Sequence, residues 1–412
     1  MNNLKAVLTA STLLCGSAAV AEGVKLEVTH WWTSGGEAAA VGALADVFSE
    51  KSDNEWVDGA IAGGGSTARP VMISRITGGD PMHATQFNHG RQAEELVEAG
   101  LMLDLTDVAD AEGWRDTINP VSLLDSCTYE GKVYCVPINI HSWQWMWLSN
   151  KAYADAGIDV PGSWDEFVAS APALEAAGKV PLVVGQQDWQ ARGAFTVLLV
   201  AVGGTDLWLD IYANKNADAV RGDAMTKVFE AADTARTLSE NSNVGDWNLA
   251  TAKIINGEAG AQIMGDWAQG EFAVAEKVAG VDYTCLPGLG MNEVIQTGGD
   301  AFYFPKHDDP AVTAAQKELA SIMFSQEAQV AFNLKKGSLP VRGDIDLSTA
   351  NDCMKKGLEI LADGNILPSA EQEISSDTEQ QMRDLFIEFF NNKDLSIADA
   401  QERMAQLIEQ AE

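Results

Sequence analysis

Basic residues are scarce in this chain. Its 412 residues include 27 lysines and arginines against 60 aspartates and glutamates, which gives a formal net charge of −33. A surface this acidic repels the phosphates of nucleic acids and the anionic headgroups of membranes. The charge therefore argues against both as partners, and it leaves the chemistry of a small-molecule ligand open.

Long apolar runs are missing beyond the N-terminus, so no later segment is expected to cross a bilayer. Residues 1–21 have a polar start with Lys5, an apolar run over 6–14, and an A-x-A pattern at 19–21. This is the layout of a secretory signal peptide, and the run is shorter than the roughly 20 residues of a spanning helix. An uncleaved anchor and lipid attachment at Cys15 are the alternatives. The prediction is cleavage after Ala21 and export to the periplasm.

Cysteine and histidine are also few. The five histidines show no paired-ligand spacing, and no cysteine spacing resembles a zinc site, so we expect no metal and no cofactor. An even number of cysteines in an oxidising compartment favours disulfides. Of the four that follow the signal peptide, Cys127 and Cys135 flank a turn-like stretch and form the favoured pair. Cys285 with Cys353 would be the second pair, and free buried thiols are the alternative.

The order of the apolar patterns indicates an α/β protein. Residues 24–30 alternate as a strand does, 31–36 read as a loop, and 37–50 have helical spacing. About 390 residues remain after cleavage, enough for two domains. No long Pro- or Ser-rich linker divides them, and the extended stretch 133–141 reads as a short crossover. The same alternation recurs in strands at 180–184, 262–264 and 302–304, and in helical patterns at 92–99, 164–176, 223–240, 311–325 and 376–391.

Twelve tryptophans are present, and several stand beside polar groups where strands end. Trp31 and Trp32 follow the first strand, and Glu37 stands at the start of the next helix. A sugar needs aromatic faces for its C–H patches and charged or amide groups for its hydroxyls. The alternative for this tryptophan pair is an interdomain packing cluster. For Trp145 and Trp147, which alternate along a strand-like stretch, the alternative is a core face.

Four further loops carry polar groups beside glycine or tryptophan. They cover residues 86–90, 265–267, 297–300 and 335–340, each next to an expected strand or helix. Each loop alone is a weak signal, because most loop aspartates and lysines are simply solvated. Together they predict one site to which distant parts of the chain contribute.

The segments 31–37, 136–141, 161–167 and 332–342 resemble the type II periplasmic solute-binding proteins. The similarity is to the family-1 sugar binders of ABC importers, near the glucose/mannose-binding branch. It implies two α/β lobes joined by a hinge, with the ligand in the cleft between them. The implied bounds are 22–138 with 296–338 for lobe 1, and 139–295 with 339–412 for lobe 2.

The resemblance also implies roles for individual residues. Gln372 stands where relatives often have a histidine. The implied partners are a glucose- or mannose-like monosaccharide and the transmembrane subunits of an ABC permease, for a monomer that is not an enzyme. A disaccharide, a glycoside or a polyol is the alternative ligand, and a secreted glycoside hydrolase using two carboxylates is the alternative function. The expected ligand-binding residues are Trp31, Trp32, Glu37, His89, Trp247, Trp267, Asp300, Lys336 and Gln372.

Overall fold

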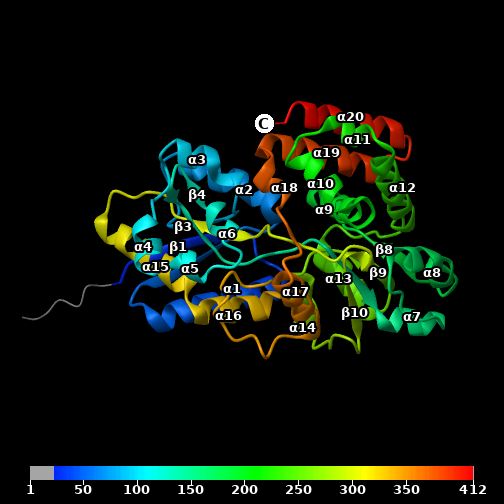
Figure 1. Ribbon diagram of the computed structural model, residues 1–412. Helices are drawn as coiled ribbons and strands as arrows, with labels where there is room; N and C mark the ends of the chain where they lie inside the picture. Colours follow the sequence, from blue (N-terminus) through cyan, green and yellow to red (C-terminus); the bar gives the residue numbers. More distant parts are fainter. Residues whose placement is uncertain (1–22, 412) are drawn as a thin grey trace, which may run out of the picture.

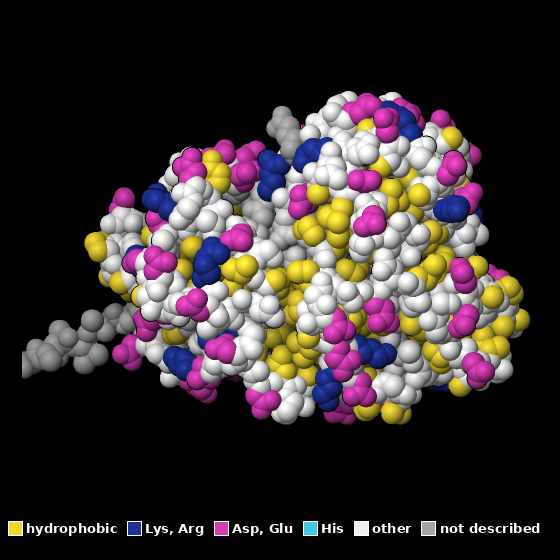
Figure 2. All heavy atoms as spheres, in the orientation of Figure 1, with side chains coloured by type: hydrophobic (Ala, Val, Ile, Leu, Met, Phe, Trp, Pro, Cys, Tyr) yellow, Lys and Arg dark blue, Asp and Glu magenta, His cyan; other side chains and the backbone are white. Residues whose placement is uncertain are grey.

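The computed structural model describes residues 23–411, so the predicted signal peptide and its cleavage site lie outside the described residues. Two α/β lobes, each with its own sheet, lie side by side (Figure 1). One hydrophobic core fills lobe 1 and continues over one face of the lobe 2 sheet, and a second core lies on the other face of that sheet. This is the α/β class and the type II two-lobe fold expected from the sequence. Acidic side chains are spread over both lobes on the face drawn in Figure 2.

Lobe 1 is built on a mixed five-stranded sheet. Strands β1 and β3 are parallel, and β12 runs antiparallel to β3, so the ends of β1 and β3 and the start of β12 lie at one edge. The strands, in sheet order, are β2 (Glu55–Ala60), β1 (Lys25–His30), β3 (Ala84–Asn88), β12 (Asp300–Tyr303) and β6 (Cys135–Pro137). The main helices are α1 (Gly35–Lys51), α2 (Gly64–Thr77), α3 (Glu94–Glu98), α4 (Thr106–Ala111), α15 (Pro310–Phe324) and α16 (Gln326–Lys336).

Lobe 2 is built on a four-stranded sheet and carries most of the C-terminal helices. Its strands, in sheet order, are β10 (Tyr283–Pro287), β7 (Trp145–Ser149), β9 (Ala259–Ile263) and β8 (Val180–Val183). Its helices are α7 (Asn150–Ala156), α8 (Trp164–Ala176), α9 (Asp188–Leu198), α10 (Gly204–Tyr212), α11 (Ala217–Arg221), α12 (Asp223–Leu238), α13 (Trp247–Asn256), α19 (Ser376–Asn391) and α20 (Ile397–Glu409).

Several short elements lie where the chain passes between the lobes. Strand β11 (Ile295–Gln296) pairs in parallel with β13 (Ile366–Leu367), and Ile140 bridges to Leu339. Around them lie α14 (Ala268–Val274), α17 (Asp352–Ala362) and α18 (Ala370–Glu373). The strands of each sheet fall within the bounds expected for that lobe, and the lobe bounds themselves stay a prediction.

The expected helices are present, and their ends follow local capping. Helices α8 and α19 begin and end where their patterns predict. Helix α1 begins at Gly35, because the Ser34 side chain accepts from the backbone N–H of Glu37 while the Glu37 side chain accepts from Ser34. The pattern at 92–99 divides into a short 3₁₀ turn and α3. Trp145 and Trp147 are fully buried, so the core alternative is the right one for both.

One stretch corrects an expectation. Residues Asp188–Tyr212, which run through α9, a π-helical turn and α10, are long and apolar enough to cross a membrane by length and composition. From the sequence, no segment beyond the N-terminus was expected to be long and apolar enough for this. Its apolar side chains lie in the core of lobe 2, where α9 packs against α19 and the π-helical turn packs against α12. The stretch is therefore explained as a core helix of this lobe.

Both predicted disulfides are confirmed. Cys127–Cys135 closes the hairpin of β4 (Thr128–Tyr129) and β5 (Lys132–Val133), with a sequence separation of 8. Cys285–Cys353 ties β10 to α17 across a separation of 68.

We expect the two disulfides to differ in their contribution to stability. Closing a longer loop removes more entropy from the unfolded chain, so Cys285→Ser/Cys353→Ser should lose about 2 kcal/mol more than Cys127→Ser/Cys135→Ser. Urea unfolding of both double variants under identical conditions measures the difference. Equal losses, or the reverse order, would contradict this account.

Candidate functional site

A cavity of about 200 Å³ lies between the lobes, and residues from both of them line it. Lobe 1 contributes the loop after β1, the first turn of α2 and the start of β12. Lobe 2 contributes the segment before β7, the start of α9 and α13, and the segment 369–371 with α19. Five tryptophans line this cavity: Trp31, Trp143, Trp189, Trp247 and Trp267.

The topology of lobe 1 brings three of the lining residues to one edge. Trp31 follows the end of β1, and Asn88 ends β3, which is parallel to β1. Asp300 begins the antiparallel strand β12, in register with Asn88. Ligands of open α/β sheets bind beyond the carboxyl ends of parallel strands, which is where these side chains meet.

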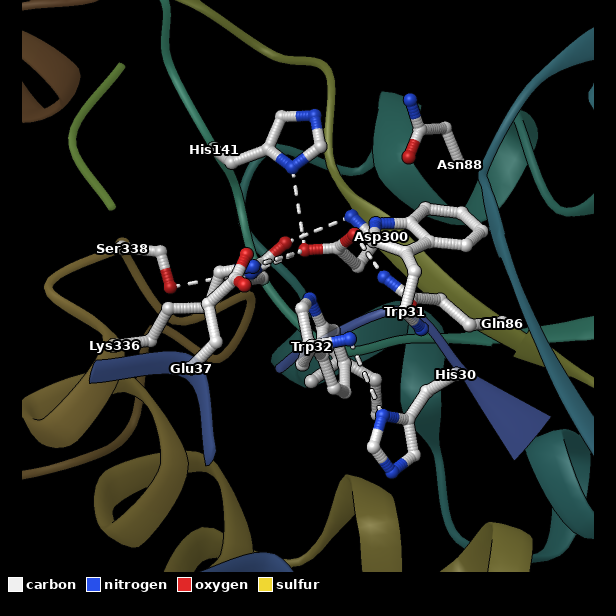
Figure 3. Close-up of polar contacts among 12 residues, drawn as sticks. His30, Trp31, Trp32, Glu37, Gln86, Asn88, His141, Asp300, Lys336 and Ser338 are labelled. Atoms are coloured by element: carbon white, nitrogen blue, oxygen red, sulfur yellow. Dashed lines mark hydrogen bonds and ion pairs between the residues drawn. The ribbon is translucent and has the colours of Figure 1, made fainter. Parts of the chain in front are cut away.

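Asp300 is the centre of a hydrogen-bond network (Figure 3). Its Oδ1 accepts a bond of 2.6 Å from Gln86 Nε2. Its Oδ2 accepts from Asn139 Nδ2 and Lys336 Nζ, both at 2.9 Å, and lies 3.2 Å from His141 Nδ1. Because both carboxylate oxygens are occupied, Asp300 mainly positions the lysine and the histidine beside it.

The charges in this network stabilise one another. Burial by itself would raise the pKa of Asp300, but Lys336 and His141 outweigh it and hold that pKa well below its ordinary value. Burial likewise works to lower the pKa of His141, and Asp300 raises it above the usual range. Lys336 also lies over the ring of Trp32, 4.7 Å from its centroid. The network therefore holds a carboxylate against a lysine and a histidine at the cavity wall, and it favours the charged form of that histidine.

An aromatic wall stands on the lobe 2 side. Trp143 and Trp267 meet edge to face with centroids 4.9 Å apart, and Trp189 lies 5.7 Å from Trp143. Trp247 lies 6.5 Å from Trp267. Trp31 belongs to lobe 1, so indole rings from both lobes line the cavity. Such rings offer flat apolar faces beside hydrogen-bonding groups, as the C–H patches of a sugar require.

Six of the nine expected binding residues line the cavity. They come from five separate parts of the chain, and the structure brings them together at one cavity. The six are Trp31, Glu37, Trp247, Trp267, Asp300 and Lys336.

The other three expected residues lie behind the cavity wall. Trp32 is 1% exposed and packs against Phe302 and Phe332 in the core of lobe 1, because it points to the opposite side of the chain from Trp31. His89 is fully buried, and its Nδ1 lies 2.8 Å from Ser126 Oγ. These placements correct the expectation of direct ligand contact for Trp32 and His89.

Gln372 requires the same correction. Its Oε1 accepts from the backbone N–H of Ser369 in a capping box, and its Nε2 lies 3.3 Å from Nδ1 of His89. The residue lines a neighbouring hollow beside the hinge and not the cavity between the lobes. At this end of the chain Glu371 reaches the cavity instead.

Several lining residues were not expected from the sequence. Trp143 stands two residues before Trp145, but only the structure shows that it lines the cavity while Trp145 and Trp147 enter the core. Trp189 had no pattern to mark it. The three glycines 63–65 at the start of α2 were a readable signal, since a ligand can approach bare backbone closely. The charged lining residues that were not expected are Arg69, Arg192, Asp246, Glu371, Glu379 and Arg383. Within residues 23–411 no three histidine, cysteine or acidic side chains are grouped as metal ligands.

Glu37 gives the site a measurable pH dependence. Removal from water raises the pKa of Glu37 to about 7 from its ordinary 4.5, although Lys336 opposes the shift. The folded protein therefore retains a proton that the unfolded chain releases, and stability falls as the pH rises from about 4.5 to 7. Glu37→Gln should remove up to about 3 kcal/mol of that fall. Urea unfolding at both ends of this range measures it.

The control is Glu50→Gln, an exposed glutamate on the same helix, which should leave the pH dependence of stability unchanged. A Glu37→Gln variant that loses stability with pH as steeply as the unaltered protein would contradict the role of burial.

Comparison with known proteins identifies the family. A model of the bacterial extracellular solute-binding protein family matches residues 32–330. Two curated relatives are each described as a probable sugar-binding periplasmic protein. The one from Brucella melitensis is 37% identical over 361 residues, covering 86% of this chain and 85% of the relative. The one from Rhizobium meliloti is 34% identical over 367 residues, covering 89% and 87%.

Solved structures show the same fold at low identity. A chitin oligosaccharide binding protein superposes with a TM-score of 0.76 at 19% identity, covering 95% of this chain and 99% of that one. The maltose-bound MalE3 of T. maritima gives 0.73 at 18% identity, covering 94% and 100%. With the family match spanning most of the chain and a relative above 30% identity over most of its length, this protein belongs to the bacterial extracellular solute-binding protein family.

Proposed function

We propose that this protein is the periplasmic sugar-binding component of an ABC importer. The observation that carries the proposal is the cavity wall itself, in which five indole rings from two lobes line the same space as the Asp300–Lys336–His141 network. Rings of this kind stack on pyranose C–H faces, and charged donors beside them bond hydroxyl groups. The curated relatives described as sugar-binding periplasmic proteins support the same role.

We further propose a monosaccharide ligand, with glucose or a close epimer as the first candidate. A cavity of about 200 Å³ is smaller than the roughly 300–1,000 Å³ typical of pockets for drug-sized ligands. Discrimination between epimers would come from the fixed hydrogen-bonding groups, because a misplaced hydroxyl leaves a buried group unpaired. In this proposal five of the nine expected residues contact the sugar: Trp31, Glu37, Trp247, Trp267 and Lys336. Asp300 holds Lys336 and His141 in place, and the other three support the wall from behind.

Ligand would stabilise the closed arrangement of the lobes by contacting both, and that form would dock on the transmembrane subunits of a permease. We expect the mature protein to act as a periplasmic monomer after removal of residues 1–21.

A glycoside hydrolase is the weaker candidate, because the carboxylate of Asp300 is already hydrogen-bonded within the protein. A catalytic carboxylate must reach the sugar or an attacking water, whereas both oxygens of Asp300 already accept bonds from Gln86, Asn139 and Lys336. Of Glu37 and Asp300, the two carboxylates that this alternative would use, only Glu37 then remains free to act.

A thermal-shift screen over monosaccharides, disaccharides and polyols tests the proposal, followed by calorimetry on the best ligand. We expect glucose or a close epimer to give the largest shift, with a Kd near 1 μM, or about −8 kcal/mol. At a hundredfold excess over Kd the gain in stability is about 2.7 kcal/mol. Turnover of oligosaccharides would overturn the binding role, and no response to any carbohydrate would overturn the sugar assignment.

A further inference from the structure

The cavity between the lobes has a second, larger hollow beside it, of about 940 Å³. This hollow runs between α2 and α3 of lobe 1 and the segment 374–381 of lobe 2. Five residues line both spaces and so form the wall between them: Ser66, Arg69, Glu371, Glu379 and Arg383.

Glu371 joins the two lobes within this wall. Its Oε2 accepts a bond of 2.6 Å from Asn88 Nδ2, and its Oε1 accepts from Gln92 Nε2 at 3.1 Å, both in lobe 1. The same Oε1 accepts from Arg383 Nη2 of lobe 2 at 3.1 Å. One carboxylate is thus held by donors from both sides of the cleft.

The remaining charges of the wall extend this network. Glu379 lies 3.0 Å from Arg192 and 3.4 Å from Arg383. Ser66 accepts from Arg383 Nη1 at 3.3 Å and donates to Asp188 Oδ1 at 3.1 Å. The side chains of Glu371, Glu379 and Arg383 are only 9–15% exposed. Charges so enclosed and mutually bonded resist displacement, since moving one leaves its partner unpaired in a buried place.

We propose that these residues form an ion gate that restricts the ligand to a single sugar ring. The gate comprises Ser66, Arg69, Asp188, Arg192, Glu371, Glu379 and Arg383. The inference rests on the proposed sugar-binding function. A ring linked to the bound monosaccharide and directed at this wall would have to break the bonds of Glu371 or Arg383. Behind the gate lies room for further rings, so opening it changes the chain length admitted.

The test is a gain of binding. Glu371→Ala removes the central carboxylate and leaves Arg383 paired with Glu379. Arg69→Ala removes a long side chain from the same wall. It loses one hydrogen bond, which Arg69 Nε donates to the carbonyl of Gly65 in its own helix. Calorimetry with glucose, maltose, cellobiose, isomaltose and trehalose compares the variants. We expect the unaltered protein to bind the monosaccharide at least 100-fold more tightly than any disaccharide. Either variant should narrow that ratio at least tenfold for one or more disaccharides.

The matched control is Glu388→Ala, which breaks another Glu–Arg pair of the same lobe, with Arg403, away from the cavity. This variant should leave the ratio of monosaccharide to disaccharide affinity unchanged. The gate proposal is wrong if the unaltered protein binds a disaccharide as tightly as the monosaccharide. It is also wrong if folded variants keep the full ratio of monosaccharide to disaccharide affinity. Either result leaves the proposed sugar binding intact. If no carbohydrate binds at all, the proposed function falls and takes the gate with it.

Discussion

Asp300→Ala is expected to destabilise the protein by about 3–5 kcal/mol and to abolish ligand binding. The substitution leaves the ammonium group of Lys336, whose side chain is 3% exposed, without its buried counter-charge. It also removes the acceptor for Gln86 and Asn139, so the edge of the sheet loses the group that orders it. Urea unfolding gives the change in stability, and calorimetry with the best sugar gives the loss of affinity.

A double variant separates the charge effect from the loss of shape. Asp300→Asn/Lys336→Met removes both charges with little change in volume, so it should be more stable than Asp300→Asn alone. Glu55→Ala, which breaks an exposed pair with Lys25, should cost no more than about 1 kcal/mol. If the double variant is the least stable of the set, pairing with the buried Lys336 is not the way in which Asp300 stabilises the protein.

Trp31→Ala is expected to reduce mainly sugar affinity and Trp32→Ala mainly stability, although the two residues are adjacent. Trp31 lines the cavity, so its truncation should weaken sugar binding roughly 30-fold or more with a small change in stability. Trp32 is buried against Phe302 and Phe332, so its truncation should cost about 3–5 kcal/mol of stability. Calorimetry and urea unfolding on both variants measure the two effects.

Trp32→Phe serves as the control, because it keeps an aromatic ring in the core and should recover most of the stability lost by alanine. Below the unfolding temperature, Trp32→Ala should retain more of its affinity than Trp31→Ala. A larger loss of affinity for Trp32→Ala would show that the wrong tryptophan has been placed at the sugar.

Much of the fold could be predicted from the sequence, because local patterns determine local structure. Helical spacing marked α8 and α19 to the residue, and alternation marked β1. The turn between Cys127 and Cys135 predicted the first disulfide, and the count of remaining cysteines left Cys285 and Cys353 as the second pair. These features depend on neighbours in the chain or on a simple count.

The candidate site was less predictable, because side chains reach it from widely separated segments. Residues at strand ends and helix starts were expected to converge, and six of the nine line the cavity. The sequence did not show which side of the chain faces the cavity. Trp31 and Trp32 look equivalent in the sequence, and only the packing of Trp32 against Phe302 and Phe332 places the second in the core.

The sequence alone therefore determined the α/β alternation, the acidic character, the disulfide partners and a family resemblance, since each is written in composition or in short patterns. Only the tertiary structure decided which of the expected residues line the cavity, which lie behind its wall, and where the cavity ends. The contact of Glu371 with Asn88 joins positions 283 residues apart. No local pattern encodes such a pair, because it forms only when the two lobes come together.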